Sequence, residues 1–422
     1  MTAIKLKYGS ETLSCDLPGA QVLQAAEQAV PAAAEELVRR SLAQPIGSAR
    51  LDQIVVPGEK VAIVASDITR YAGSEIFLPI LVEELNRIGV PDRDIAIIIA
   101  LGIHRPQTAA EHRQILGPLY GRVAVYDHAC DAPEELVDLG VTAGGIPVGV
   151  NRRVVEADRV IVTGTIGFHY FAGFGGGRKG LVPGVASRET CMASHFAVFN
   201  PPAIGGKHPR AVTGVLKGNP VHENLLQAAR LVRPDFLLNT VLSPQKQILG
   251  VFSGELEQAH QAGCAQVRDL FQVPLAQPAD LAVISCGGEP KDINFIQAQK
   301  ALDYGCRAVK AGGTIILLAA CRDGFGHPTF FDWFRYQDLD EFEQALRAAY
   351  QINGQTAHAV LTKARRHRVI LISGFSREQT ETMGMEKAPD LQSALAWVLP
   401  DLPENARTVV IPDGGIVLPV VE

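Results

Sequence analysis

Three short apolar runs constrain the fold of this 422-residue chain more than any other feature. They are Val61–Ala65, Ile95–Leu101 and Val160–Thr163, and a polar loop follows each one. Because these runs are apolar without alternation, they predict strands that are buried on both faces. Helical patterns between them, such as Ile76–Ile88, complete a repeated order of strand, polar loop and helix. This order predicts an α/β fold with mainly parallel sheets.

The same order resumes after a polar, proline-containing stretch at residues 272–280. A chain of this length has room for two domains, each with its own core. We therefore predict an N-terminal α/β domain over residues 1–272 and a C-terminal α/β domain over residues 278–406. The strands expected in the second domain are 281–285, 314–318 and 368–373, and one of its helices is expected over 292–311.

Charge and cysteine content exclude several classes of function. The net charge of −6 argues against a broad attraction to nucleic acid or to a membrane surface. The N-terminus has no signal-peptide pattern. Seven cysteines form no C-x-x-C pair, which favours reduced thiols. The expected location is therefore cytoplasmic, with neither nucleic acid nor a membrane as a partner.

The stretch Gly167–His195 reads GFHYFAGFGGGRKGLVPGVASRETCMASH and carries the strongest chemical signal. Glycines allow backbone N–H groups to approach an anion closely. Lys179 follows them and has two possible roles, as a phosphate contact or as an amine nucleophile. The stretch does not fit the P-loop pattern, and it meets G-x-G-x-x-G only if Lys179 faces solvent. It therefore predicts a less common phosphate or cofactor loop, with the candidate residues Gly175, Gly176, Gly177, Arg178 and Lys179.

Other candidate residues follow the predicted strands. Arg70 and His104 come just after the first two apolar runs, and His169 comes after the third. If those three strands are neighbours in one parallel sheet, their loops converge at its carboxyl edge. In the second domain, Gln297 and Lys300 lie about one helical turn apart on one face.

Four segments together resemble one known family. They are Asp67-Ile-Thr-Arg70, Gly102-Ile-His104, Gly167–His195 and Gln297-Ala-Gln-Lys300. In this order they resemble the nickel-pincer nucleotide-dependent lactate racemase family, and the resemblance covers most of the chain. It implies two α/β domains with the active site in the cleft between them. It also implies that residues 407–422 rejoin the first domain.

The resemblance implies a cofactor site. The cofactor is the nickel-pincer nucleotide, pyridinium-3-thioamide-5-thiocarboxylic acid mononucleotide with Ni(II). Lys179 matches the lysine that binds it covalently as a thioamide, and His195 matches the histidine that completes the coordination of nickel. Soft sulfur donors with one imidazole suit a square-planar Ni(II). Proteins of cofactor biosynthesis are then expected as transient partners.

The resemblance also implies the substrate residues and the reaction. His104 and His169 match the two histidines that exchange protons with the substrate, while Arg70, Gln297 and Lys300 match the residues that hold its carboxylate. The α-hydrogen of a 2-hydroxy acid is only weakly acidic, so its transfer as hydride to a cofactor avoids a carbanion. Two bases with pKa values near neutrality serve the two faces of the carbon. The implied activity is that of an isomerase, a racemase or epimerase of a small 2-hydroxy acid.

Two other functions stay open at this point, and so does the substrate. One is a zinc hydrolase built on His104, His169 and His195, although no H-E-x-x-H motif is present. The other is a non-catalytic module that binds the nucleotide, which would have no need for two proton-transfer histidines. The residue before Gln297 is Ile296, where the lactate enzyme has tyrosine. Another 2-hydroxy acid, or epimerisation of a sugar acid, is therefore also compatible with the sequence.

Overall fold

The protein was analysed as a computed structural model that describes residues 3–26 and 29–422. The chain divides into two compact units. The central unit is Glu27–Asp269, and the terminal unit combines Met1–Ala26 with Leu270–Glu422. Each unit is an α/β structure around a mainly parallel sheet, which confirms the predicted fold class. Among the described residues, no helix has the length and apolar character needed to cross a membrane.

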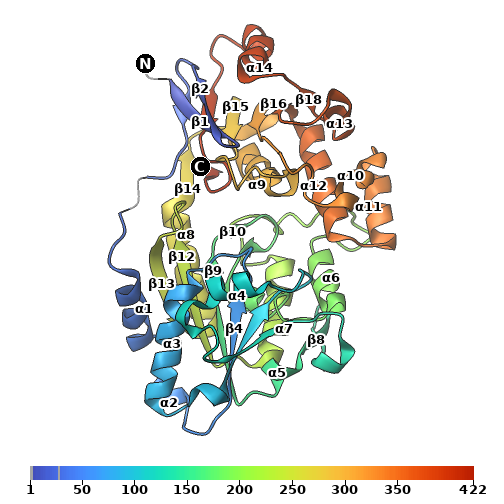
Figure 1. The fold of residues 1–422 in the computed structure, drawn as a ribbon. Helices are drawn as coiled ribbons and strands as arrows, with labels where there is room; N and C mark the ends of the chain where they lie inside the picture. Colours follow the sequence, from blue (N-terminus) through green and yellow to red (C-terminus); the bar gives the residue numbers. More distant parts are fainter. Residues whose placement is uncertain (1–2, 27–28) are drawn as a thin grey trace. The chain divides into compact units, whose positions relative to one another are not determined.

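The sheet of the central unit has the strand order β13-β12-β9-β4-β5-β6. Figure 1 labels four of these strands, β13, β12, β9 and β4. Its strands run parallel except β13, which is antiparallel to β12. The three apolar runs form β4, β5 and β9, and β4 lies between the other two. Their predicted loops therefore leave the same edge of one sheet. The strands are β4 (Val61–Ser66), β5 (Ile95–Ala100), β6 (Ala124–Asp127), β9 (Arg159–Ile166), β12 (Phe236–Leu242) and β13 (Ile248–Gly254).

Helices α1 to α4 pack on one face of this sheet. Alternate residues of β4 and β5 point into that core, where Ile63 and Ile97 meet Phe77 of α3. Helix α1 begins at Ala34, with Glu35 and Glu36 in its first turn. The helices of the unit are α1 (Ala34–Ala43), α2 (Leu51–Ile54), α3 (Ser74–Ile88), α4 (Ala109–Leu116), α5 (Arg152–Val155), α6 (Arg188–Phe196), α7 (Pro220–Val232) and α8 (Leu256–Phe271).

Short strands and one tight turn complete the central unit. β7 (Leu136–Val141) pairs with β8 (Pro147–Asn151), and β10 (Phe168–His169) pairs with β11 (Gly173–Phe174), both antiparallel. The 3-10 turn η4 (Gly177–Gly180) follows β11. The stretch with the strongest chemical signal therefore folds as a small hairpin, a tight turn and the helix α6.

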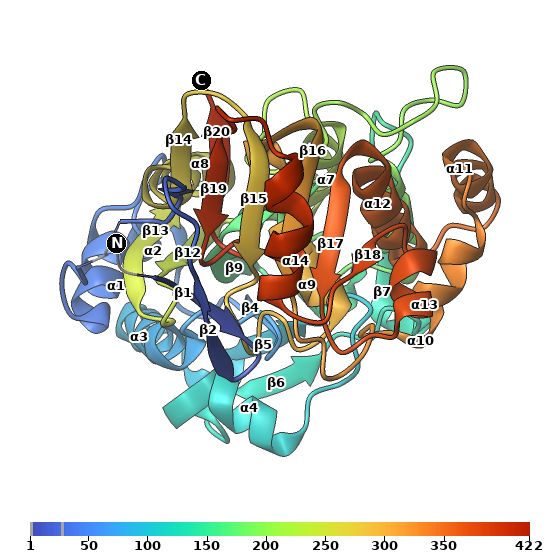
Figure 2. The same ribbon diagram turned by 90° about the horizontal axis from the view of Figure 1, so that it is seen from above.

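The terminal unit has a second six-stranded sheet, in the order β18-β17-β16-β15-β19-β3, and all its pairs are parallel. Figure 2 shows β19, β15, β16 and β17 side by side. One face of the sheet packs against helix α14 and against the hairpin of β1 and β2. The strands are β1 (Ile4–Tyr8), β2 (Glu11–Cys15), β3 (Gln21–Val22), β15 (Ala279–Ser285), β16 (Val309–Leu318), β17 (Arg368–Ile372), β18 (Glu386–Lys387) and β19 (Thr408–Ile411).

The ends of the chain differ from the predicted domain division. Residues 407–422 were expected to rejoin the first domain, but β19 pairs with β15 and β20 (Leu418–Val421) pairs with β14 (Gln272–Leu275). The N-terminal hairpin also belongs to the terminal unit, because Leu6 is buried in its core. Strands that are far apart in sequence are therefore hydrogen-bonded neighbours in the terminal unit. The helices of the unit are α9 (Phe295–Gly305), α10 (Pro328–Asp332), α11 (Leu339–Ala348), α12 (Ile352–Arg366), α13 (Arg377–Thr382) and α14 (Leu391–Val398).

Candidate functional site

The loops after β4, β5 and β9 leave the carboxyl edge of one parallel sheet, where ligands bind in open α/β folds. One backbone hydrogen bond joins the last two loops, and a second one lies within the later loop. The N–H of Gly102 donates to the carbonyl of Gly184 at 2.8 Å, and the N–H of Gly184 donates to the carbonyl of Lys179 at 3.2 Å. The turn that carries His104 therefore lies against the segment that carries Lys179.

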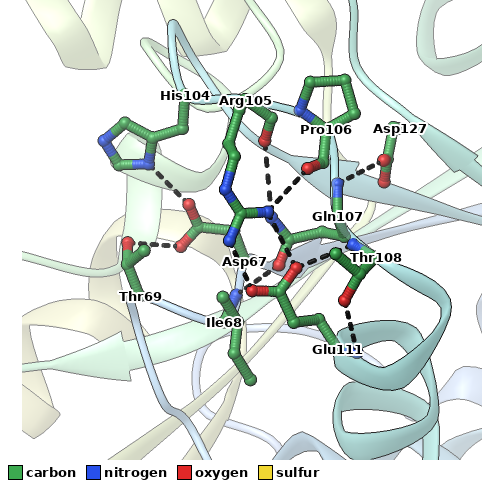
Figure 3. A network of polar contacts seen from close by, with 10 residues as sticks. All are labelled: Asp67, Ile68, Thr69, His104, Arg105, Pro106, Gln107, Thr108, Glu111 and Asp127. Carbon is green, nitrogen blue, oxygen red and sulfur yellow. Dashed lines mark hydrogen bonds and ion pairs between the residues drawn. The ribbon is translucent and has the colours of Figure 1, made fainter.

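His104 forms a partly buried pair with Asp67 (Figure 3). Nδ1 of the imidazole donates to Oδ2 of Asp67 at 2.5 Å, and Thr69 Oγ1 donates to the other carboxylate oxygen at 2.8 Å. The carboxylate is 1% exposed, whereas the imidazole is 42% exposed. Because Nδ1 is used as a donor, Nε2 of His104 keeps its lone pair for a proton.

The turn around His104 is anchored to its neighbours (Figure 3). The side-chain oxygen of Gln107 accepts from the backbone N–H of Ile68 at 3.0 Å. The backbone N–H of Gln107 donates to Asp127 Oδ2 at 2.7 Å. The Arg105 guanidinium makes two bonds to Glu111, at 2.8 and 2.7 Å. These contacts tie the loop after β5 to the loop after β4, to β6 and to α4. They fix the His104 turn relative to Asp67.

Phe171 brings three predicted residues together. The centre of its buried ring lies 4.6 Å from that of His169 and 5.2 Å from that of His195, and 5.9 Å from Lys179 Nζ. Asn219, which is also buried, donates to the carbonyl of Phe171 at 2.9 Å. Phe171 has no role predicted from the sequence, because an apolar residue inside a motif carries no chemical signal of its own.

The environment of Lys179 lowers the pKa of its side-chain amine. Burial, followed by the positive charges of Arg178 and Arg70, lowers its pKa to about 7. An amine near that pKa is about half deprotonated at neutral pH, as a nucleophilic lysine requires. The environment of Lys179 therefore fits covalent chemistry better than simple charge pairing with a phosphate.

His169 lies on β10 and is partly buried. Burial lowers its pKa well below the ordinary value, and the nearby charges of Lys179, His195, Arg70 and Arg178 act in the same direction. Its Nδ1 accepts a hydrogen bond from the N–H of Ala172 at 3.3 Å. The ring is therefore neutral at pH 7 and is held by the backbone of its own hairpin.

His195 presents one nitrogen to a ligand. Its Nδ1 donates to the carbonyl of Cys191, one helical turn earlier, at 2.7 Å, which leaves Nε2 with a free lone pair. Burial and the charge of Lys179 lower the pKa of His195 to about 3, so the ring is neutral. Burial also raises the pKa of the Cys191 thiol to about 11. At this point in the fold the neutral imidazole is thus a better metal ligand than the thiol.

The glycine run has the left-handed backbone that its residue type permits. Gly176 and Gly177 have φ values of 69° and 55°, and the N–H of Gly177 donates to Asn239 Oδ1 at 2.7 Å. A Cβ on Gly176 would lie 2.7 Å from the same oxygen. Arg178 is 1% exposed and donates to the carbonyl of Ala172 at 2.8 Å. It therefore holds the β10–β11 hairpin from inside.

The remaining predicted residues are Arg70 in the central unit and Gln297 and Lys300 in the terminal unit. Arg70 follows Asp67 in the central unit and is exposed. Gln297 and Lys300 are in α9 of the terminal unit, where Lys300 Nζ donates to Gln297 Oε1 at 2.6 Å. The side chain of Asn294 accepts from the N–H of Gln297 and starts this helix. The structure thus brings Arg70, His104, His169, Lys179 and His195 to one edge of the central sheet.

The geometry does not support a zinc hydrolase. Within residues 3–26 and 29–422, no three side chains of the His, Cys, Asp or Glu type lie together as a group that could hold a metal. His104, His169 and His195 are thus not a shared ligand set.

Comparisons with known proteins show the family of this chain. Residues 8–205 match the lactate racemase N-terminal domain family, and residues 275–419 match the lactate racemase C-terminal domain family. The lactate racemase of Thermoanaerobacterium thermosaccharolyticum is 32% identical over 443 residues, with 99% of each chain covered. The lactate racemase of Lactiplantibacillus plantarum is 34% identical over 437 residues, with 99% of this chain and 100% of that protein covered.

Solved structures give the same result for the fold. The lactate racemase apoprotein from T. thermosaccharolyticum superposes with a TM-score of 0.89 at 32% identity, covering 99% of this chain and all of that chain. A protein from Thermotoga maritima, 21% identical, superposes with a TM-score of 0.70 over 94% of this chain and all of that chain, and shares the fold. With both domain families matched and relatives similar over their full length, the chain belongs to the lactate racemase family.

Proposed function

We propose that this protein is a racemase or epimerase of a 2-hydroxy acid that uses a covalently bound nickel-pincer nucleotide. The observation that carries the proposal is the group around Phe171. There an amine with a pKa of about 7, on Lys179, lies near His195, whose Nε2 is free. A nucleophilic amine beside a single neutral imidazole fits a cofactor that brings its own soft metal ligands.

The residues present fit this cofactor. Lys179 would form the covalent link, and His195 would ligate the nickel through Nε2. Gly176 and Gly177 let the turn that carries Lys179 pack closely against Asn239 and His260, where a Cβ would collide. When bound, the cofactor supplies an acceptor that takes a hydride from the α-carbon of the substrate and returns it. The protein itself supplies position, charge and proton transfer.

In this proposal the two histidines handle the hydroxyl proton. Nε2 of His104 accepts it, and the Asp67 carboxylate lies 2.5 Å from the other ring nitrogen, next to the positive charge that develops. His169 serves the opposite hand of the substrate. Arg70, Gln297 and Lys300 hold the substrate carboxylate, as the resemblance implies. Proteins of cofactor biosynthesis are proposed as transient partners, because the cofactor has to be supplied.

The Asp67–His104 pair argues against a module that only binds the nucleotide. A buried carboxylate that orients a solvent-accessible imidazole is an arrangement for proton transfer, and binding alone gains nothing from it. The identity of the acid is a separate matter. Ile296 stands where the lactate enzyme has tyrosine, so the proposal covers 2-hydroxy acids as a class.

The test is to produce the protein together with the cofactor-biosynthesis proteins, then measure its nickel content and its conversion of a panel of 2-hydroxy acids. We expect bound nickel and racemisation of at least one acid, with α-deuterium retained in the product. His195→Ala should lose both nickel and activity, whereas the matched Cys191→Ala should keep both. Loss of nickel only in Cys191→Ala, or rapid exchange of the α-deuterium with solvent, would refute the proposal.

A further inference from the structure

The two histidines assigned to proton transfer have different hydrogen-bond partners at the same ring atom. For His104 the partner of Nδ1 is an acceptor, the Asp67 carboxylate. For His169 the partner of Nδ1 is a donor, the N–H of Ala172. The partner of one imidazole nitrogen decides which nitrogen carries the proton in the neutral ring.

The acceptor at Nδ1 of His104 is held in place by a second contact. Asp67 Oδ2 lies 2.5 Å from Nδ1, and Thr69 engages the other carboxylate oxygen, so the carboxylate cannot turn away freely. A carboxylate is an acceptor only, and Nδ1 must therefore carry the proton. Nε2 is then the nitrogen with the lone pair.

The partner of His169 Nδ1 is a backbone N–H group, that of Ala172. The N–H of Ala172 can only donate, so the Nδ1 that faces it must present its lone pair. Ala172 is itself held, because its carbonyl accepts from the buried guanidinium of Arg178 and from the N–H of Phe174. Lys179, His195, Arg70 and Arg178 all disfavour a positive His169 ring, and the ring of Tyr170 stacks on it at 5.5 Å. The proton of the neutral ring is then on Nε2.

We propose that the protein holds His104 and His169 in opposite tautomers, with the lone pair on Nε2 in His104 and the proton on Nε2 in His169. Asp67 and the Ala172 peptide are the positioning groups. From this resting state His104 can take a hydroxyl proton at Nε2 at once. His169 must first lose the Nε2 proton or move it to Nδ1, where the Ala172 N–H opposes it.

The kinetic consequence rests on the proposed racemase function. The two enantiomers of an acid with one stereocentre have equal free energies, so kcat/KM must be equal in the two directions. Opposite tautomers favour the enantiomer whose hydroxyl faces His104. We therefore expect kcat to be larger for one enantiomer, with KM larger by the same factor. Equal kcat values in an active enzyme would contradict this consequence.

The tautomers can be measured without any activity. The full chain, produced with and without the cofactor-biosynthesis proteins, is labelled with 15N in its histidine rings and studied by long-range 1H–15N NMR. A pH of about 9 is suitable because it is well above the ordinary imidazole pKa of about 6.5. His104→Gln and His169→Gln assign the two rings. We expect the 15N chemical shift of an unprotonated ring nitrogen at Nε2 of His104 and at Nδ1 of His169. The same tautomer in both rings would overturn the inference.

A pair of variants tests the role of Asp67. Asp67→Asn keeps an acceptor oxygen and should preserve the His104 tautomer, whereas Asp67→Leu should leave a mixture of both tautomers. Neither change should alter the His169 signals. If Asp67→Leu leaves His104 unchanged, Asp67 is not the positioning group. Because this readout is independent of turnover, an inactive protein with opposite tautomers would refute the proposed function alone.

Discussion

The central and terminal units share a six-stranded, mainly parallel sheet, and polar loops follow their strands in both. In the central unit these loops carry Asp67, His104 and His169, and His104 keeps a free ring nitrogen. In the terminal unit the loop after β15 is occupied by the N-terminal hairpin. Asp292 accepts from the N–H of Gly9 at 2.8 Å, and the carbonyl of Gly9 accepts from the N–H of Glu289 at 3.0 Å.

The two units differ in the residues that lie at the ends of their strands. Topology points to the carboxyl ends of the strands in both sheets. In the central unit the side chains there include the imidazoles of His104 and His169 and the amine of Lys179. In the terminal unit Asp292 accepts from backbone N–H groups, and Lys291 donates to the side chain of Asp413. The residues at the strand ends, rather than the fold, decide the function.

The largest expected effect comes from the histidines of the central unit. His104→Ala and His169→Ala should each lower the rate of racemisation by about 10²–10⁴-fold, because each turnover needs one base and one acid. The double variant should lose little more than either single one, since the two residues act as a unit. His327→Ala, at an exposed helix start of the terminal unit, is the control and should keep the activity. Full activity in the double variant would remove the chemical distinction between the units.

The next effect is the reactivity of Lys179. With a pKa of about 7, its neutral fraction at pH 7 exceeds that of an ordinary lysine by about 10³-fold. Labelling with acetic anhydride, followed by mass spectrometry, should give a rate for Lys179 that levels off above pH 8, while the rates of surface lysines keep rising. Between about pH 7 and the ordinary value of 10.5, the unfolded chain binds more protons at this residue than the native state does. The contribution of Lys179 to stability should therefore increase with pH in that window. A labelling rate that follows the surface lysines would contradict the assigned environment.

The smallest effect on activity is expected in the terminal unit. Asp292→Ala removes the acceptor of two buried N–H groups, those of Gly9 and Ala320. Each unsatisfied group costs about 1–3 kcal/mol, so the midpoint of urea unfolding should fall clearly. Asp292→Asn keeps one acceptor oxygen and should lose less. Folded protein of both variants should keep its rate of racemisation; a lost rate with unchanged stability would give this loop a chemical role.

The sequence predicted the parts of the fold that depend on local pattern. Continuous apolar runs predicted β4, β5 and β9. Helix α9 was predicted over residues 292–311 but spans Phe295–Gly305, because Asn294 caps its start and β16 already begins at Val309. Local pattern is weaker at such boundaries, since tertiary pairing decides them.

The parts that could not be predicted depend on contacts between distant segments. The order of the strands brings the loops of His104 and Lys179 together. This order cannot be predicted from any single segment of the sequence. The same is true of the N-terminal hairpin, whose place in the terminal unit follows from the burial of Leu6. Phe171 and Asn239 support the site by packing and by one hydrogen bond, and neither has a distinctive motif. Chemically reactive residues were therefore easier to identify than the residues that position them.

The central claim is that the cofactor binds at the strand ends of the central unit through Lys179, and peptide mass spectrometry tests it most directly. The protein, produced with the cofactor-biosynthesis proteins, is digested and searched for the adduct. We expect the added mass on the peptide that contains Lys179, its retention in Lys300→Ala and its absence in Lys179→Ala. An adduct that persists in Lys179→Ala, or that maps to Lys300 of the terminal unit, would contradict the claim.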